Sequence, residues 1–152
     1  LNQQGKVAEI SYACLYIVRD GVAITPLISS GILESITRES VKSLLEQELN
    51  VPVVEREVER TELYIADEVF ICGTSVEIQP VGSVDRYQVG DGQTGPVTAR
   101  LQSLFERVAR GGHPGYADWC TPVYQGQQTR PPSGLRRQKY PPQPLQMRPR
   151  PC

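Results

Sequence analysis

A run of aromatic and β-branched residues near the start of the chain constrains its fold more than any other feature. Residues 13–18 are ACLYIV, the run ends at Arg19-Asp20-Gly21, and residues 22–25 resume the same apolar pattern. Asp-Gly between two such runs is a strong signal for a two-residue hairpin turn, because both residues tolerate positive φ. The sequence therefore predicts an antiparallel hairpin over residues 13–25.

Two amphipathic helices are predicted from apolar residues that recur at three- and four-residue spacing. The first begins after Ser35, a hydroxyl residue in capping position, and ends before Pro52. The second runs from Gly95-Pro96 to Gly111-Gly112. Helices interleaved with strands predict an α/β fold.

Shorter segments between the helices predict the remaining strands. Residues 51–58 alternate apolar with charged side chains and predict a half-exposed strand, and residues 61–67 predict a short helical turn. Two buried strand runs are predicted on either side of Gly73-Thr74-Ser75. A break of this composition leaves backbone N–H groups free to meet an anion.

A change of composition after Tyr124 divides the 152-residue chain into a body, 1–124, and a tail, 125–152. The tail is rich in Pro, Gln and Arg, so it is predicted to be disordered. It holds six basic residues and no acid, which leaves ten basic residues against seventeen acidic ones in the body. An acidic body gives no reason to expect a nucleic-acid partner.

Cysteine, histidine and hydropathy patterns exclude other classes. The four cysteines form no CxxC pair, which favours reduced thiols in a cytoplasmic protein. The single histidine, His113, lies in a Gly-Gly-His-Pro-Gly run that favours a turn, so no metal site is predicted. No apolar run approaches the roughly 20 residues of a membrane span, and no signal peptide is predicted.

Two sites combine hydroxyl side chains with free backbone N–H groups. Ser35-Ile36-Thr37 stands at a predicted helix start, and Gly73-Thr74-Ser75 stands between strands. Both arrangements suit a phosphate group. On spacing alone, capping is the more frequent role of such a residue at a helix start.

Three stretches together resemble a known family. They are SSGILESITRES at 29–40, ELYIADEVFICGTSVEIQPVGSVD at 62–85 and VGDGQTGPVTARLQ at 89–102. They resemble the C-terminal domain of class IV pyridoxal-phosphate-dependent aminotransferases, and within that class the branched-chain amino acid aminotransferases. The resemblance extends from Leu1 to about Tyr124. It implies an incomplete copy of that large α/β domain, with packed helices on a mixed sheet and pyridoxal 5′-phosphate as cofactor.

The resemblance also assigns roles to single residues. It implies phosphate binding by the backbone at Ile36 and by the hydroxyls of Thr37 and Thr74. The amides of Ser75 and Val76 are expected to hold the substrate carboxylate. Leu33 is expected to pack on the cofactor ring.

The opening motif departs from the family. Members typically have E-G-S-G-E-N-L-F where this chain has Glu9 to Tyr16, so Ala13 replaces the glutamate that pairs with the pyridinium nitrogen. Glu9 is retained, but no ring role is predicted for it. Ile10 and Tyr12 replace glycines and are expected to crowd the cofactor site.

Two further departures concern the covalent anchor and the phosphate turn. The Schiff-base lysine of the family lies upstream of the matched part, and Lys6, Lys42 and Lys139 all lie outside its motif, so no catalytic residue is predicted. Ser35 stands where the family usually has glycine, and serine fits that turn without strain only if its φ stays negative.

Three functional hypotheses follow. The first is the C-terminal part of a branched-chain aminotransferase, from branched-chain amino acid biosynthesis, inactive alone. The second is a non-catalytic scaffold whose tail presents polyproline to a partner through Arg130-Pro131-Pro132 and residues 140–144. The third is a class IV lyase or D-amino acid aminotransferase. The incomplete sheet also predicts homo-oligomers or association through exposed strand edges.

Overall fold

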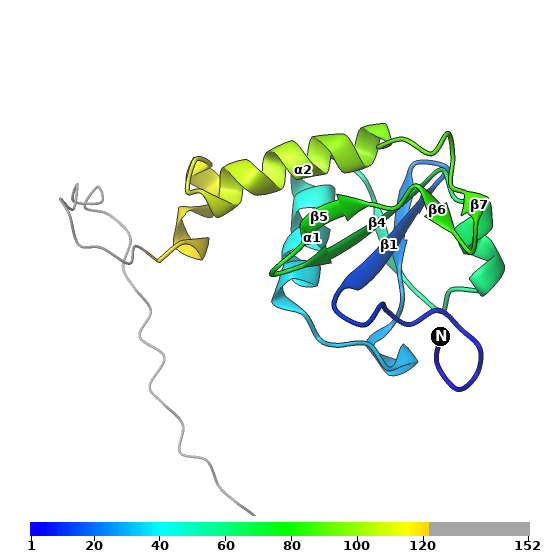
Figure 1. Ribbon diagram of the computed structural model, residues 1–152. Coiled ribbons are helices and arrows are strands. Elements are labelled where there is room, and N and C mark those ends of the chain that lie inside the picture. The colour runs from blue at the N-terminus through cyan, green and yellow to red at the C-terminus, as the bar shows by residue number, and fades with distance from the viewer. Residues whose placement is uncertain (122–152) are drawn as a thin grey trace, which may run out of the picture. The chain divides into compact units, whose positions relative to one another are not determined.

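A mixed five-stranded sheet organises the part of the chain that the computed structural model describes, residues 1–121. Its order is β3-β2-β1-β4-β5, and only the β2–β3 pair is parallel (Figure 1). The strands are β1 Cys14–Arg19, β2 Val22–Thr25, β3 Val53–Glu55, β4 Glu68–Gly73 and β5 Glu77–Pro80. The predicted α/β class with a mixed sheet is confirmed.

The predicted hairpin is β1 and β2. Asp20 and Gly21 have φ of 51° and 76°, the positive values that a two-residue turn of this kind requires. β1 lies in the centre of the sheet and is buried on both faces, which explains why its sequence is apolar without alternation.

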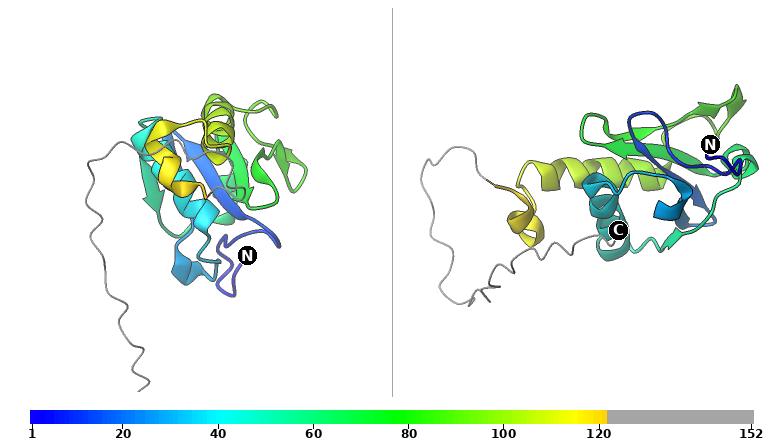
Figure 2. Two further views of the ribbon diagram at one scale, coloured as in Figure 1. Left: turned by 90° about the vertical axis from the view of Figure 1, so that its left-hand side faces the viewer. Right: turned by 90° about the horizontal axis from the view of Figure 1, so that it is seen from below.

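Two helices cover one face of the sheet, α1 Ile36–Gln47 and α2 Pro96–Ala109 (Figures 1 and 2). Both were predicted from periodicity. Their apolar stripes meet Tyr16 and Phe70, whose rings stack at 5.1 Å between centroids. The opposite face packs on the N-terminal segment, the 3₁₀ helix η2 Arg60–Tyr64 and Val89. None of the described helices has the length and apolar character needed to cross a membrane.

The remaining short elements complete the body. They are the 3₁₀ helices η1 Ile28–Ser30 and η3 Pro114–Trp119, and the two-stranded pair β6 Ser83–Val84 and β7 Tyr87–Gln88. His113 stands at the N-cap position of η3, without a capping hydrogen bond from its side chain, in the turn that its neighbours predicted. The predicted tail 125–152 lies outside the described residues, together with the end of the predicted body.

Two strand predictions need correction. The strand predicted over 51–58 is only three residues long, because its partner β2 ends at Thr25 and pairs with β3 only as far as Glu55. The second run beside Gly73 is not buried, because β5 is an edge strand on which only Ile78 is buried. β3 and β5 are the two edges of the sheet, and association through them stays a prediction.

A buried carboxylate fixes the start of α2. Glu68, on β4, accepts hydrogen bonds from the Val97 N–H at 2.9 Å, the Thr98 N–H at 2.8 Å and the Thr98 hydroxyl at 2.6 Å. A negative charge at a helix N-terminus is favourable. Gly95 makes room for this contact, since a Cβ there would lie 2.1 Å from Glu68 Cδ. The helix is therefore attached to the sheet by an acid 29 residues upstream of its first partner.

Replacing that acid tests the attachment. Glu68→Ala leaves the buried Thr98 N–H and hydroxyl without an acceptor, and we expect it to lower the free energy of unfolding by about 3 kcal/mol. Urea unfolding followed by circular dichroism measures the change. Glu106→Ala, which removes an exposed ion pair with Arg110 on the same helix, is the control and should cost less than about 0.5 kcal/mol. Equal losses in the two variants would contradict the capping role.

Candidate functional site

A cavity of about 310 Å³ lies among three segments that are far apart in the sequence. These are the N-terminal segment leading into β1, the loop before α1, and the turn between β4 and β5. Its lining includes Glu9, Cys14, Leu33, Ser35, Thr74 and Ser75. The cavity thus joins the two hydroxyl-bearing segments that the sequence singled out.

The predicted site residues divide into two groups. Leu33, Thr74 and Ser75 line the cavity. The cavity lining does not include Ile36, Thr37 or Val76, although Ile36 follows the lining residue Ser35 and Val76 follows the lining residue Ser75. Ile36 is the first residue of α1 and is 87% exposed. The roles given to all six remain predictions.

The start of α1 keeps two amide donors available. The Ser35 hydroxyl accepts the Arg38 N–H at 3.3 Å, and the Ser35 carbonyl accepts the Glu39 N–H at 3.1 Å. The N–H groups of Ile36 and Thr37 belong to the first turn and have no partner within the helix. Ser35 has φ −91°, so serine occupies this turn without strain. This helix start can therefore receive an anion beside the cavity.

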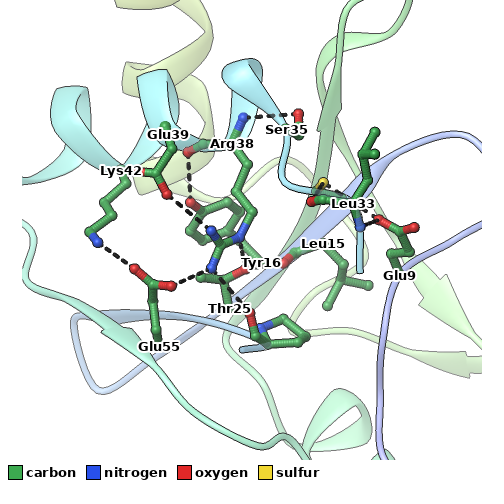
Figure 3. Close-up of polar contacts among 12 residues, drawn as sticks. Glu9, Leu15, Tyr16, Thr25, Leu33, Ser35, Arg38, Glu39, Lys42 and Glu55 are labelled. Carbon is green, nitrogen blue, oxygen red and sulfur yellow. Dashed lines mark hydrogen bonds and ion pairs between the residues drawn. The ribbon is translucent and has the colours of Figure 1, made fainter. Parts of the chain in front are cut away.

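A buried arginine holds that helix start in place (Figure 3). The Arg38 side chain is 1% exposed, and its Nη2 donates to Glu55 Oε2 at 2.7 Å and to the Pro26 carbonyl at 3.1 Å. Its Nε donates to the Thr25 hydroxyl at 3.3 Å. One side chain thus connects α1 to the end of β2 and to β3.

Two neighbours complete this cluster. The Tyr16 hydroxyl donates to the Arg38 carbonyl at 2.9 Å, so β1 is also linked to the start of α1. Lys42 forms a second ion pair with Glu55. The hydrogen bonds from Lys42 and Arg38 hold the pKa of Glu55 below its ordinary value. Lys42 is therefore engaged by Glu55 and does not line the cavity.

The turn between β4 and β5 presents the second pair of hydroxyls. Gly73 pairs with Glu77 across the turn, and Glu77 has φ 53°. Thr74 and Ser75 are exposed, and neither hydroxyl makes a hydrogen bond within residues 1–121. These groups are free to bind a ligand in the cavity.

A carboxylate for which the sequence predicts no ring role, Glu9, lies in the cavity wall. Glu9 Oε2 accepts the Leu33 N–H at 3.1 Å and lies 3.7 Å from the Cys14 thiol, which donates to it. No other acid lines this cavity among the described residues. Ala13, which the resemblance places at the position of the ring's acidic partner, also lines the cavity but offers no acceptor. The available signal was the position of Glu9 at the head of the same motif.

The two lysines within residues 1–121 are engaged elsewhere. Lys6 pairs with Glu59 and Lys42 with Glu55, and neither lines the cavity. Lys139 lies outside the described residues. The described cavity therefore offers hydroxyls, amides and a carboxylate, but no amine.

Comparison with known proteins decides the family. The family profile described as "Amino-transferase class IV" matches residues 1–84, more than half of the chain. The chain belongs to the class IV aminotransferase family. This confirms the resemblance drawn from the motifs.

Relatives of this class IV aminotransferase chain are branched-chain enzymes by name. It is 48% identical over 124 residues to the "Probable branched-chain-amino-acid aminotransferase" of Aquifex aeolicus, covering 82% of this chain and 40% of that protein. It is also similar to the branched-chain amino acid aminotransferase of Thermobaculum terrenum in PLP-form, with 48% identity and a TM-score of 0.80 over 82% of this chain and 41% of that one. The branched-chain aminotransferase of Thermoproteus uzoniensis with norvaline gives 43% identity and a TM-score of 0.77 over 82% of this chain and 40% of that one.

The length of the match matters for function. The chain spans about two fifths of the length of the curated relatives it matches. The family and the fold are therefore shown for this chain, whereas the activity of the whole enzymes belongs to longer proteins.

Removal of the Arg38 side chain tests its role in this family member. Arg38→Met leaves Glu55 with one cation fewer and the buried Thr25 and Pro26 oxygens without their donor, so we expect a loss of about 3 kcal/mol in unfolding free energy. Chemical denaturation gives the value. Glu39→Gln removes only the half-exposed contact at Arg38 Nη1 and should cost less than about 0.5 kcal/mol. A loss below about 1 kcal/mol for Arg38→Met would contradict the anchor.

The same cluster predicts acid sensitivity. The folded-state pKa of Glu55 is lowered, so its contribution to stability is present above the ordinary carboxyl value and is lost as pH falls through the folded value. We expect Glu55→Gln to flatten the acid limb of a plot of unfolding free energy against pH, relative to the unsubstituted chain. Urea unfolding at a series of pH values below about 5 measures both slopes. An unchanged slope in Glu55→Gln would refute this linkage.

Proposed function

We propose that this chain supplies the cofactor-phosphate and substrate-carboxylate sites of a branched-chain amino acid aminotransferase, which moves an amino group between leucine, isoleucine or valine and 2-oxoglutarate. The observation that carries the proposal is the joining of Leu33, Thr74 and Ser75 in one cavity beside the start of α1. The names of the relatives described above favour this reaction over the lyase and D-amino acid alternatives.

The described residues fit pyridoxal phosphate. Free N–H groups at Ile36 and Thr37, with the hydroxyl of Thr74 across the cavity mouth, suit a phosphate dianion. Leu33 offers an apolar side chain, 68% exposed, that a planar ring can cover. When bound, this cofactor supplies a conjugated ring that accepts electrons during amino transfer.

Glu9 would serve the ring nitrogen. A carboxylate beside a pyridine nitrogen favours its protonated form and raises its pKa. The Leu33 N–H and the Cys14 thiol hold the Glu9 carboxylate in the cavity wall, so it is oriented before any ligand binds. This proposal differs from the expectation, drawn from Ala13, that the ring has no acidic partner.

The carboxylate of an amino acid or a 2-oxo acid would bind at the β4–β5 turn. The amides of Ser75 and Val76, together with the free Ser75 hydroxyl, are the donors there. These donors would orient the substrate, while the described cavity lining supplies no amine to anchor the cofactor.

The described cavity lining contains no lysine, and the proposed aminotransferase role and its alternative, a non-catalytic scaffold, account for this differently. A class IV aminotransferase needs that amine, so this chain would act only together with the lysine-bearing part of such an enzyme. A non-catalytic scaffold is the alternative that the missing lysine favours. The two differ in whether the cavity still supports amino transfer once a lysine is supplied.

The isolated chain should not transaminate. We expect no borohydride-trapped pyridoxal phosphate at a single lysine, and no 2-oxoisocaproate from leucine and 2-oxoglutarate. Absorbance titration, borohydride reduction with peptide mass spectrometry, and a coupled assay measure cofactor binding, trapping and turnover. Turnover with one trapped lysine would show that a substitute amine exists and would overturn the fragment hypothesis.

A chimera supplies the lysine and tests the cavity itself. Residues 1–121 replace the matched region of the Aquifex aeolicus relative, and the chimera should convert leucine. In that chimera Glu9→Gln should lower kcat about 100-fold, as for loss of a preorganised electrostatic group. Glu34→Gln, an exposed acid outside the cavity lining, is the matched control and should leave kcat unchanged. A folded chimera that binds pyridoxal phosphate without turnover would favour the scaffold.

A further inference from the structure

Two free cysteines face each other across the centre of the sheet. Cys14 on β1 is the direct register partner of Cys72 on β4, and the two strands are antiparallel. Both side chains belong to the core on the helix-covered face, at 3% and 0% exposure, and both line the cavity. The fold therefore places two thiols side by side in the wall of one cavity.

The backbone geometry of such a pair already suits a disulfide. Directly opposite residues in an antiparallel pair have Cα atoms about 4.5–5.5 Å apart and side chains on the same face. Disulfides span Cα separations of about 4.4–6.8 Å. Closing the bond would therefore need little more than side-chain rotation.

We propose that Cys14 and Cys72 form a reversible disulfide across the cavity wall, by exchange with a small organic disulfide. The Cys14 thiolate attacks one sulfur of the reagent, which breaks the reagent's S–S bond, releases one thiol and leaves a mixed disulfide on Cys14. The Cys72 thiolate then attacks the Cys14 sulfur and releases the second thiol. Two protein thiols lose two electrons, the reagent gains them, and the two protons leave on its thiols.

The order of attack follows from the surroundings of the two sulfurs. Cys14 Sγ lies 3.7 Å from Glu9 Oε2 and 3.9 Å from the Leu33 carbonyl, beside groups of the cavity lining. Cys72 has no exposed surface. Burial raises the pKa of both thiols, that of Cys72 to about 12, so the exchange is slow and the pair persists as thiols without an oxidant.

Oxidation also changes the cavity. A Cys14 sulfur in a disulfide carries no hydrogen, so it no longer donates to Glu9, which keeps the Leu33 N–H alone. The carboxylate then becomes freer to move. The effect of this change on cofactor binding rests on the proposed function, whereas the disulfide itself does not.

The test uses the full chain and 2-hydroxyethyl disulfide as oxidant. After incubation, free thiols are blocked and non-reduced peptides are mapped by mass spectrometry. We expect one cross-link between the peptides of Cys14 and Cys72, a loss of two hydrogens, and complete reversal by dithiothreitol. Because no cofactor is present, a negative result leaves the proposed function intact.

Matched variants separate this pair from the other thiols. Cys120→Ser should keep the cross-link, because Cys120 lies outside this cavity. Cys72→Ser should stop the reaction at a mixed disulfide on Cys14, and circular dichroism checks that this variant remains folded. The proposal would be overturned if Cys14 and Cys72 both remained free thiols after incubation with the oxidant and were then blocked. Cross-links that involve Cys120 or Cys152 in place of this pair would also overturn it.

Discussion

The buried guanidinium of Arg38 is the interaction on which the candidate site depends. It lies under the first turn of α1 and bonds Thr25, Pro26 and Glu55, which belong to segments that the sheet brings together. A desolvated charge is tolerated only where partners surround it, so this contact can form only when β2, β3 and α1 are all in place. The direction of the free amides at the helix start is a consequence of that assembly.

A buried charge also attaches the second helix, α2, to the sheet. Glu68 performs for α2, as a buried acid at the helix start, what Arg38 performs for α1 as a buried base. Arg38 points from α1 towards the sheet and Glu68 points from the sheet towards the start of α2, so neither charge lines the cavity, whose described rim offers hydroxyls and amides. The one carboxylate in the described lining, Glu9, is held by Leu33 and Cys14. Scaffold charges and ligand-binding groups are thus kept on separate surfaces.

The features that could be predicted from the sequence are those that depend on residues close together in the chain. The Asp20-Gly21 turn and the Ser35 cap could be predicted from the sequence because each depends on its own φ or on a partner three residues away. The length of β3 depends on where its partner β2 ends, and the contact that holds the start of α2 depends on an acid 30 residues away from Thr98, so neither could be predicted from spacing, although the helix start at Gly95-Pro96 was. The candidate site shows the same division. Thr74 and Ser75 could be singled out because their motif is contiguous, whereas no local signal placed Glu9 in the cavity wall, because its partner there is the Leu33 amide, 24 residues along the chain.

The central claim is that a phosphate binds between the start of α1 and the β4–β5 turn. Backbone amide shifts during titration with pyridoxamine 5′-phosphate, which needs no lysine, test it directly, with pyridoxamine as the comparison without phosphate. We predict that the amides of Ile36, Thr37 and Thr74 shift with the phosphorylated ligand and much less with pyridoxamine. Shifts confined to other segments, or equal shifts with both ligands, would contradict it.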